Sequence, residues 1–398
     1  MNEHNFNELI TKELPNRFRG SERKKTVVID RNVYLLKLPD PVREKNRSLS
    51  YINNSISEYL GCHILKSLGF EVQETLLGTY YDKDKNKTYI ACACKDICTD
   101  GYSLGEIADI SLSDESYSKY AEETTLSAVH KIAEKISKTD NITLEDILSF
   151  YYDLLIADLL IGNTDRHNRN WGILTHPSNP TKIAPVFDCG SSLSPLLSDE
   201  DLDHININNI AKDETTVLHE PGNKRYKWLD LLSINNEYAF YILEAAKRII
   251  PRIDINKIHD IIDNTPYITD KRKDFYKSII SIRYEQVLLP YLDKSLNKDI
   301  IPCKLDNPYE VYKTLGLNNL NIGEELNIEN RDVYLKKVSN RYALIHDIDG
   351  SFKDICPIRS NNDDIRKMLS ILKETVYTNN KNIPNNITRE DVNNGFER

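Results

Sequence analysis

The chain has 398 residues, of which 40% are hydrophobic and 28% charged, and its formal net charge is −9. This composition is typical of a soluble globular protein with two or three domains and excludes collagen-like and low-complexity chains. The acidic balance argues against a dedicated DNA-binding protein, so we expect no direct nucleic-acid binding. The N-terminal stretch MNEHNFNELITKEL lacks a signal-peptide pattern, and no apolar run reaches the roughly 18 residues of a membrane span.

The first segment, residues 1–97, is predicted to be a small sheet with one helix. Apolar residues at helical spacing predict a helix over Ser57–Leu68 that stops at Gly69. The triplet Asp30-Arg31-Asn32 predicts a hairpin turn between the first two strands. The predicted strands are Thr26–Ile29, Val33–Leu38, Glu74–Tyr81 and Thr88–Cys94.

The second segment, residues 98–300, is predicted to be mainly helical. Thr143 is the expected N-cap of a helix over Leu144–Ile161, since acidic residues occupy the first turn that follows it. The loop-rich interval 162–193 contains short predicted strands at Gly172–Leu174 and Ala184–Phe187. The other predicted helices are Ala121–Lys138, 226–250, 255–263 and 270–296.

The third segment, residues 301–398, has a different composition and is predicted to be a small appended α+β domain. Two strands are expected at Val333–Lys337 and Tyr342–Asp347, and a helix near Asp364–Thr375. An Asn-rich tail follows, which we expect to be flexible.

Seven cysteines occur at irregular spacing, which is typical of reduced thiols in a cytoplasmic protein. Cys92, Cys94 and Cys98 lie close together, and two interpretations are open. They are either ligands of a metal ion or small thiols on a strand, and the missing second ligand pair favours buried thiols.

The string GNTDRHNRNWGIL, followed by APVFDCGSS, carries the main chemical signal. Asp165 and Asn170 are five positions apart, and Asp188 follows Asn170 by 18 residues. Phosphoryl transfer needs a carboxylate for the attacking hydroxyl, and an amide and a second carboxylate for Mg²⁺. The alternative is an ordinary polar turn between a helix and a strand pair. His167 is expected to position the loop rather than to transfer a proton.

Lys37 interrupts the apolar strand VYLLKLP, where a buried amine needs a negative partner. Glu58, 21 residues later on the predicted helix, is the candidate carboxylate, and nucleotide phosphates are the other candidate partner. Two alternatives stay open. Lys37 could extend from an edge strand into solvent, and Glu58 could be a first-turn acid that stabilises the helix dipole.

The string FRGSERKKTVVI comes just before the first predicted strand. Backbone amides at Gly20 and Ser21, with Lys24 or Lys25, could cover the β- and γ-phosphates of a nucleotide. The string is not a G-x-G-x-x-G loop, so its pattern alone has little specificity.

Taken together, GSERKKTV, YLLKLP, NSISEYLGCHILKSLGF, GNTDRHNRNWGIL and FDCGSS resemble the HipA-type serine/threonine kinases, in the same order along residues 15–298. The resemblance implies an α+β, two-lobed protein-kinase-like fold, also shared with phosphoinositide kinases. It implies Asp165 as catalytic base, Asn170 and Asp188 as Mg²⁺ ligands, Lys37 on the ATP phosphates, and a hinge near Cys94 and Asp96.

The resemblance further implies a bacterial toxin that phosphorylates a protein, with translation components such as an aminoacyl-tRNA synthetase as candidate targets and a cognate antitoxin as candidate partner. The sequence departs from long HipA toxins in having only about 16 residues before the phosphate loop, and in continuing about 100 residues beyond the family's usual end. Two other functions remain open. A lipid kinase of the phosphoinositide type shares the DRHNRN string, and an inactive nucleotide-binding pseudokinase would share the fold.

Overall fold

The computed structural model describes residues 4–15, 24–39, 52–139, 141–219, 224–234, 236 and 238–296, together with four strands between 325 and 357. The chain divides into two compact units. The first comprises Met1–Leu231 and Ala245–Pro290, and the second comprises Leu232–Glu244 and Tyr291–Arg398.

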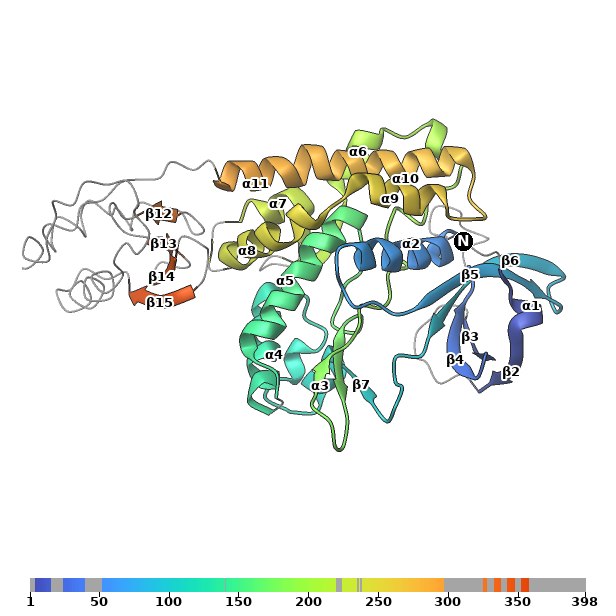
Figure 1. Cartoon of the computed structure of the whole chain (residues 1–398), viewed down its shortest axis with the longest axis horizontal. Coiled ribbons are helices and arrows are strands. Elements are labelled where there is room, and N and C mark those ends of the chain that lie inside the picture. Colours follow the sequence, from blue (N-terminus) through green and yellow to red (C-terminus); the bar gives the residue numbers. More distant parts are fainter. Residues whose placement is uncertain are drawn as a thin grey trace, which may run out of the picture. The chain divides into compact units, whose positions relative to one another are not determined.

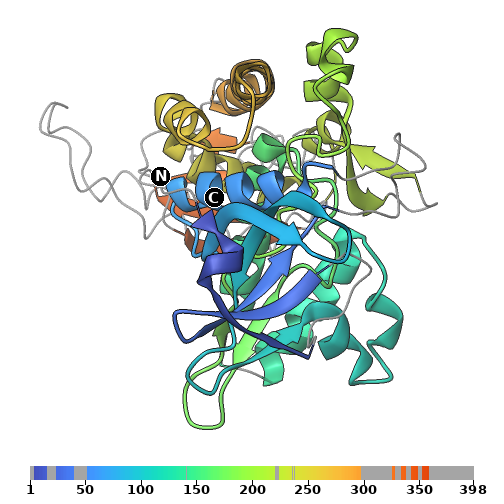
Figure 2. The ribbon, with the colours of Figure 1, turned by 90° about the vertical axis from the view of Figure 1, so that its right-hand side faces the viewer.

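A curled six-stranded sheet forms the N-terminal part of the first unit (Figures 1 and 2). Its strand order is β1-β5-β6-β4-β3-β2, in which β1 and β5 run parallel and the other neighbours antiparallel. The short helix α1 (Phe6–Leu9) connects β1 to β2. The strands are β1 (His4–Asn5), β2 (Ile10–Leu14), β3 (Lys24–Ile29), β4 (Asn32–Lys37), β5 (Thr75–Asp82) and β6 (Lys87–Lys95).

One face of this sheet encloses a hydrophobic core. The core is built from alternate residues of the strands, because successive side chains of a strand point to opposite faces. Its members are Phe6, Val27, Ile29, Tyr34, Leu36, Leu38, Tyr80, Tyr89, Ala91 and Ala93. The opposite face carries Lys37, which therefore points away from this core.

A two-residue turn joins β3 to β4, as the sequence predicts. Asp30 and Arg31 both have positive φ, 47° and 65°, which is the geometry that matches the twist of a tight hairpin. The Asn32 side-chain amide donates to the Asp30 carbonyl at 3.0 Å. The resulting register sets Lys24 opposite Lys37, so these two residues lie on the same face of the sheet.

Helix α2 (Asn54–Ser67) packs on β5 and β6 (Figure 1). It begins three residues before the predicted Ser57, because three of the four residues in its first turn are buried but polar and apolar periodicity does not reveal them. It ends as predicted before Gly69, whose φ is 95°. A Cβ at Gly61 would lie 2.6 Å from the Cβ of Cys189, so glycine lets α2 approach this turn of the chain closely.

Helix α5 (Leu144–Ile161) has the predicted bounds and is largely buried. The Thr143 hydroxyl accepts from the Asp146 N–H at 3.1 Å, which confirms the predicted N-cap. Gly162, with φ 63°, ends the helix in a left-handed conformation and turns the chain into the loop that follows.

Other predicted elements are shorter than the sequence pattern suggests. The predicted helix Ala121–Lys138 begins at Leu126, after a single 3₁₀ turn. The predicted helix 226–250 is a strand and two helices, and 270–296 contains a π-helical turn at Tyr284–Leu288. The remaining elements are β7 (Ser103–Glu106), α3 (Ile107–Leu112), α4 (Leu126–Thr139), β8 (Gly172–Thr175), β9 (Lys182–Ile183), α6 (Ile207–Asp213), β10 (Thr215–His219), β11 (Arg225–Lys227), α7 (Trp228–Leu232), α8 (Ala239–Ile249), α9 (Ile255–Asp263), α10 (Asp270–Arg283) and α11 (Leu289–Leu296).

The second unit contains a four-stranded antiparallel sheet in the order β12-β13-β14-β15. The predicted strands β13 (Val333–Lys337) and β14 (Tyr342–Asp347) are confirmed, and β12 (Glu325–Asn327) and β15 (Phe352–Pro357) flank them. Lys336 is fully buried and pairs with Glu244 and Glu325. The predicted helix Asp364–Thr375 and the Asn-rich tail lie outside the described residues.

Cys92 and Cys94 are buried on β6, with their sulfurs 3.9 Å apart, whereas Cys98 is exposed. In the part of the chain that the structure describes, no group of three or more His, Cys, Asp or Glu side chains is arranged to hold a metal ion. The interpretation as buried strand thiols therefore fits Cys92 and Cys94. Across the same residues, no helix has the length and the apolar run that crossing a bilayer requires.

Candidate active site

Lys37 lies at the centre of a buried charge cluster. Its side chain is only 7% exposed, and its Nζ donates to Glu58 Oε2 at 2.7 Å and to Asp188 Oδ1 at 2.6 Å. Because β4 lies between β3 and β6, Lys37 is not on an edge strand. The alternative in which it extends into solvent is therefore wrong.

Glu58 is fully buried in the second turn of α2. Besides binding Lys37, it accepts a hydrogen bond from the Cys189 N–H on Oε1 at 3.2 Å. An exposed first-turn acid would do neither, so the helix-dipole alternative does not describe this residue. Both Glu58 oxygens instead connect α2 to the two chain segments that carry Lys37 and Asp188.

Asp188 adopts an unusual backbone conformation, with φ 58°. A left-handed backbone conformation is unfavourable for residues other than glycine, and it is often found in functional turns. Burial by itself would raise the pKa of the Asp188 carboxyl, but the charge of Lys37 and its hydrogen bond hold that pKa below its usual value. Asp188 is therefore a stable carboxylate next to Lys37.

The loop between α5 and β8 holds Asp165 and Asn170 through short internal hydrogen bonds. The Asp165 N–H donates to Asn163 Oδ1 at 3.2 Å, and Asn170 Nδ2 donates to the Asp165 carbonyl at 2.7 Å. Since the Asn170 amide nitrogen is used inside the loop, its Oδ1 is the atom that can coordinate a cation. Asp165 is half-buried, and its pKa is raised, first by burial and further by the negative charge of Asp188.

His167 supports the loop from within. Its Nδ1 accepts from the Arg169 N–H at 3.2 Å, so the neutral ring carries its proton on Nε2. That Nε2 lies 3.9 Å from Asp165 Oδ2. This distance is longer than a hydrogen bond, and the positioning role of His167 stays a prediction.

Arg166 joins the two halves of the site, and our sequence reasoning missed it. Its buried guanidinium pairs with both oxygens of Asp158 on α5, at 2.9 and 3.1 Å. It also donates to the backbone carbonyls of Asn170 and Phe187. One side chain therefore connects the Asp165 loop to the residue before Asp188. Asp158, which lies in the apolar last turns of α5, could have indicated a buried cationic partner.

The same loop is attached to the segment before α4. Asn168 Nδ2 donates to the carbonyls of Tyr120 at 3.1 Å and Glu123 at 3.0 Å, and Arg169 pairs with Asp109 and Glu122. These contacts leave the loop little freedom to change conformation.

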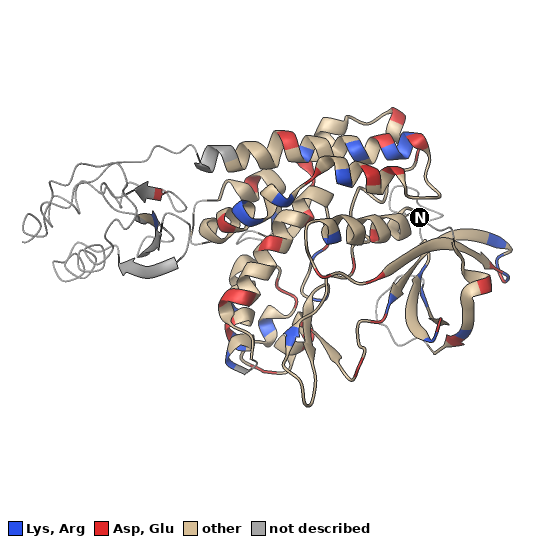
Figure 3. Cartoon of the chain, viewed as in Figure 1, with Lys and Arg blue, Asp and Glu red and all other residues tan. Residues whose placement is uncertain are grey.

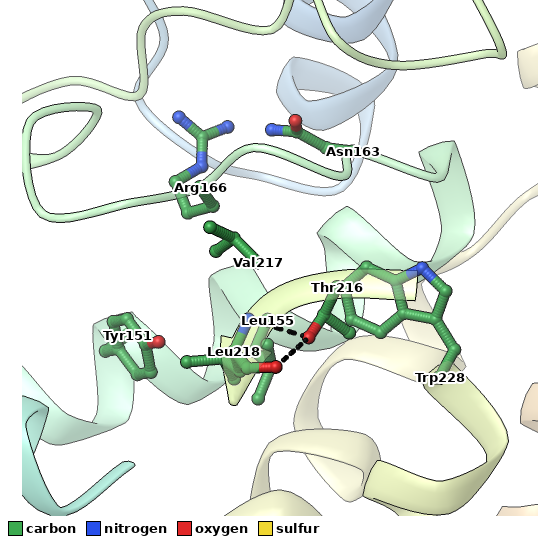
Figure 4. A pocket seen from close by; sticks show the side chains of 8 residues that line it. All are labelled: Tyr151, Leu155, Asn163, Arg166, Thr216, Val217, Leu218 and Trp228. Atoms are coloured by element: carbon green, nitrogen blue, oxygen red, sulfur yellow. Dashed lines mark hydrogen bonds between the residues drawn. The ribbon is translucent and has the colours of Figure 1, made fainter. Parts of the chain in front are cut away.

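β10 packs beneath the loop, and a small cavity remains between them (Figure 4). Asn163 and Arg166 line one side of it, and Val217 and Trp228 line the other. The buried Trp228 Nε1 has no hydrogen-bond partner among the described residues. Apolar and aromatic side chains therefore form the floor of the site.

The remaining predicted residues are placed less centrally. Lys24 shares the face of Lys37, whereas Lys25 lies on the opposite face and pairs with Glu13 at 3.0 Å. Cys94 is buried on β6, and Asp96 follows that strand and accepts from the Cys98 N–H at 2.9 Å. Gly20 and Ser21 lie outside the described residues.

The site has the donor set that a hard divalent cation prefers. Carboxylate and amide oxygens are suitable Mg²⁺ ligands, and Mg²⁺ uses few protein groups because it keeps several waters. Asp188 and the Oδ1 of Asn170 fit this requirement. A cation and an amine beside two carboxylates can bind and neutralise phosphate groups, which is the basic requirement of phosphoryl transfer.

Comparisons with known proteins point in the same direction. The family described as the HipA-like C-terminal domain matches residues 19–259. The serine/threonine-protein kinase CtkA of Helicobacter pylori strain J99 is 36% identical over 280 residues, which is 68% of this chain and 82% of CtkA.

One solved structure shows that the fold is similar to that of a known kinase. The crystal structure of a Helicobacter pylori proinflammatory kinase CtkA aligns with a TM-score of 0.65 and 30% identity, covering 75% of this chain and 100% of that chain. A complex of HipA, HipB and operator DNA from Shewanella oneidensis MR-1 aligns with a TM-score of 0.43 and 14% identity, covering 67% of this chain and 61% of that one.

Proposed function

The chain belongs to the HipA-like C-terminal domain family and is a serine/threonine kinase of that family, and we propose that it uses ATP and Mg²⁺ to phosphorylate a protein. The observation that carries the proposal is the buried ion-pair cluster in which Lys37 binds Glu58 and Asp188. A lysine held in this way can bind nucleotide phosphates without leaving its charge uncompensated.

We assign the roles as follows. Asp165 orients the acceptor hydroxyl and accepts its proton, and its raised pKa makes it a better base than an ordinary aspartate. Asn170 and Asp188 would hold Mg²⁺, which neutralises the phosphate charge. Lys37 binds the phosphates, and Lys24 and the backbone near Gly20 and Ser21 would cover them. Cys94 and Asp96 belong to the hinge segment, which we propose contacts the adenine of ATP.

The proposed substrate is a protein in the cytoplasm. Lys and Arg are interspersed with Asp and Glu along the described elements, without one uniformly basic element (Figure 3). Among the described elements, this distribution favours a protein over a nucleic acid as the substrate. The likeness to HipA-type kinases makes translation components, including aminoacyl-tRNA synthetases, the first substrates to test, and a cognate antitoxin the first partner.

The test is transfer of label from [γ-³²P]ATP. Wild-type protein is incubated with a bacterial lysate and, in parallel, with vesicles that contain phosphoinositides, and an Asp165→Asn variant serves as control. We expect phosphoserine or phosphothreonine in lysate proteins with the wild type only, identified by mass spectrometry. Label in lipid would indicate a lipid kinase instead. No label in either sample, despite ATP binding, would indicate a pseudokinase.

We further propose the predicted division into residues 1–97, 98–300 and 301–398, with the nucleotide site confined to the first two parts. All candidate site residues precede residue 189. A protein ending near residue 300 should therefore bind ATP with the affinity of the full chain, measured by calorimetry. Its unfolding temperature should be lower, because Glu244 on α8 loses its buried partner Lys336. Loss of ATP binding in a folded truncated protein would contradict this division.

A further inference from the structure

Besides the hydrogen bond from the Ser55 hydroxyl to the Lys37 carbonyl at 3.2 Å, the start of α2 is held by contacts of Asn53. Asn53 immediately precedes α2, but its side chain makes no capping bond to the helix. Its Nδ2 donates instead to the Leu197 carbonyl at 2.8 Å, and its backbone N–H donates to the Pro195 carbonyl at 3.1 Å. Asparagine before a helix commonly caps it. Here its side chain binds the segment that follows Asp188.

Arg272 of α10 holds that segment from the other side. Its side chain is almost completely buried, and Nη2 donates to the same Leu197 carbonyl at 2.8 Å. Its Nε donates to Asp199 Oδ1 at 2.7 Å, and the Thr269 hydroxyl donates to Asp199 Oδ2 at 2.7 Å. A single carbonyl therefore connects the beginning of α2 to α10.

These contacts bear on the candidate active site because Glu58 follows Asn53 by five residues. Glu58 pairs with Lys37 at 2.7 Å, and Gly61 contacts Cys189 without space for a side chain. A small displacement of the end of α2 would lengthen the ion pair. Since 1 Å of misplacement can cost a large factor in rate, the position of this helix end matters to the chemistry.

We propose that Asn53 and Arg272 are positioning residues that hold the N-terminal end of α2, through the Leu197 carbonyl, where Glu58 can pair with Lys37. Their effect on turnover rests on the proposed kinase function, whereas their effect on α2 does not. The two effects can therefore be measured separately.

The informative variant is Asn53→Asp. Aspartate is as good an N-cap as asparagine and its charge suits a helix N-terminus, so α2 itself is not weakened. An ionised carboxylate cannot donate to the Leu197 carbonyl, however, and would place two acceptors face to face. Arg272→Lys keeps the charge beside Asp199 but lacks the planar fork that serves two acceptors at once.

The first readout is amide hydrogen exchange over Asn54–Ser67 in the protein without nucleotide. We expect faster exchange there in Asn53→Asp and Arg272→Lys. The second readout is kcat/KM for ATP, which should fall about three- to tenfold in both, the factor that corresponds to one hydrogen bond. The control is Arg248→Ala, which removes the ion pair with Asp153 at 2.7 Å. Whatever its effect on the unfolding temperature, this variant should change neither amide exchange over Asn54–Ser67 nor kcat/KM for ATP.

Wild-type exchange in Asn53→Asp would overturn the proposal, because the lost donor would then not hold the helix. Faster exchange with unchanged kcat/KM would also overturn it, because Glu58 would then not depend on these residues. If the wild type transferred no phosphate at all, the proposed function would fail, and the exchange measurement alone would decide whether Asn53 and Arg272 hold α2.

Discussion

Replacing Asp188 with alanine should abolish phosphoryl transfer, with a fall in kcat of at least about a thousandfold. The substitution removes the carboxylate that we propose binds Mg²⁺, and the neighbouring carboxylate of Glu58 is fully buried, with both oxygens engaged by Lys37 and the Cys189 N–H. Lys37 keeps Glu58 as a partner at 2.7 Å, so its charge stays compensated and the protein should remain folded. The measurement is steady-state transfer of label from [γ-³²P]ATP, together with the thermal unfolding temperature.

Two further variants define what the result means. Asp188→Asn keeps the shape of the side chain and loses its charge, so it should be nearly as inactive as the alanine variant. Asp114→Ala removes an exposed carboxylate outside the site and should have wild-type turnover. Near-normal activity in a folded Asp188→Ala protein would show that Asp188 is not a metal ligand in the reaction.

Removing the charge of Lys37 should lower kcat/KM for ATP about a hundredfold, as measured in Lys37→Met. Glu58→Gln should lower it about tenfold, because the amide cannot hold the lysine charge in the same place. The double variant should be little worse than Lys37→Met alone, since Glu58 can no longer hold the lysine charge once Lys37 is gone, and glutamine can still accept from the Cys189 N–H. Kinetic constants for the two single variants and the double variant test this non-additivity.

The sheet itself provides a matched control for this pair. Lys25 and Glu13 form a second lysine–glutamate contact at 3.0 Å, but both side chains are substantially exposed. Lys25→Met, Glu13→Gln and their double variant should leave kcat/KM unchanged, because exposed ion pairs contribute little. Strict additivity of two large effects at Lys37 and Glu58 would mean that both matter, but not to each other.

The sequence predicts the pairing of Lys37 with Glu58, but not the second contact of Lys37, with Asp188. A lysine inside an apolar strand requires a buried anion, and this requirement makes Glu58, on the following helix, the candidate partner. Local patterns were also reliable where a capping residue or a glycine marks an end. Helix α5, with Thr143 before it and Gly162 after it, has the predicted bounds.

Contacts between distant segments could not be predicted in this way. Arg166 stands in a string of polar residues, and nothing in its neighbours indicates that its guanidinium is buried against Asp158. The first turn of α2 is buried but mostly polar, so periodicity placed the helix start too late. The interval 226–250 has helical periodicity throughout, but tertiary contacts divide it into β11, α7 and α8.

The burial of Arg166 also limits how this chain can vary. Its guanidinium is 5% exposed and Asp158 is fully buried, so losing either partner leaves an unpaired charge, at a cost of about 3–5 kcal/mol. That is a large part of the stability of an ordinary domain. Substitutions that weaken the Asp165 loop through Arg166 would therefore reduce the amount of folded protein more than they changed the rate of phosphoryl transfer. Substitutions that accumulate during evolution should therefore be confined to the exposed side chains around the loop, such as Glu122. The identities of the buried Arg166 and Asp158 should stay unchanged.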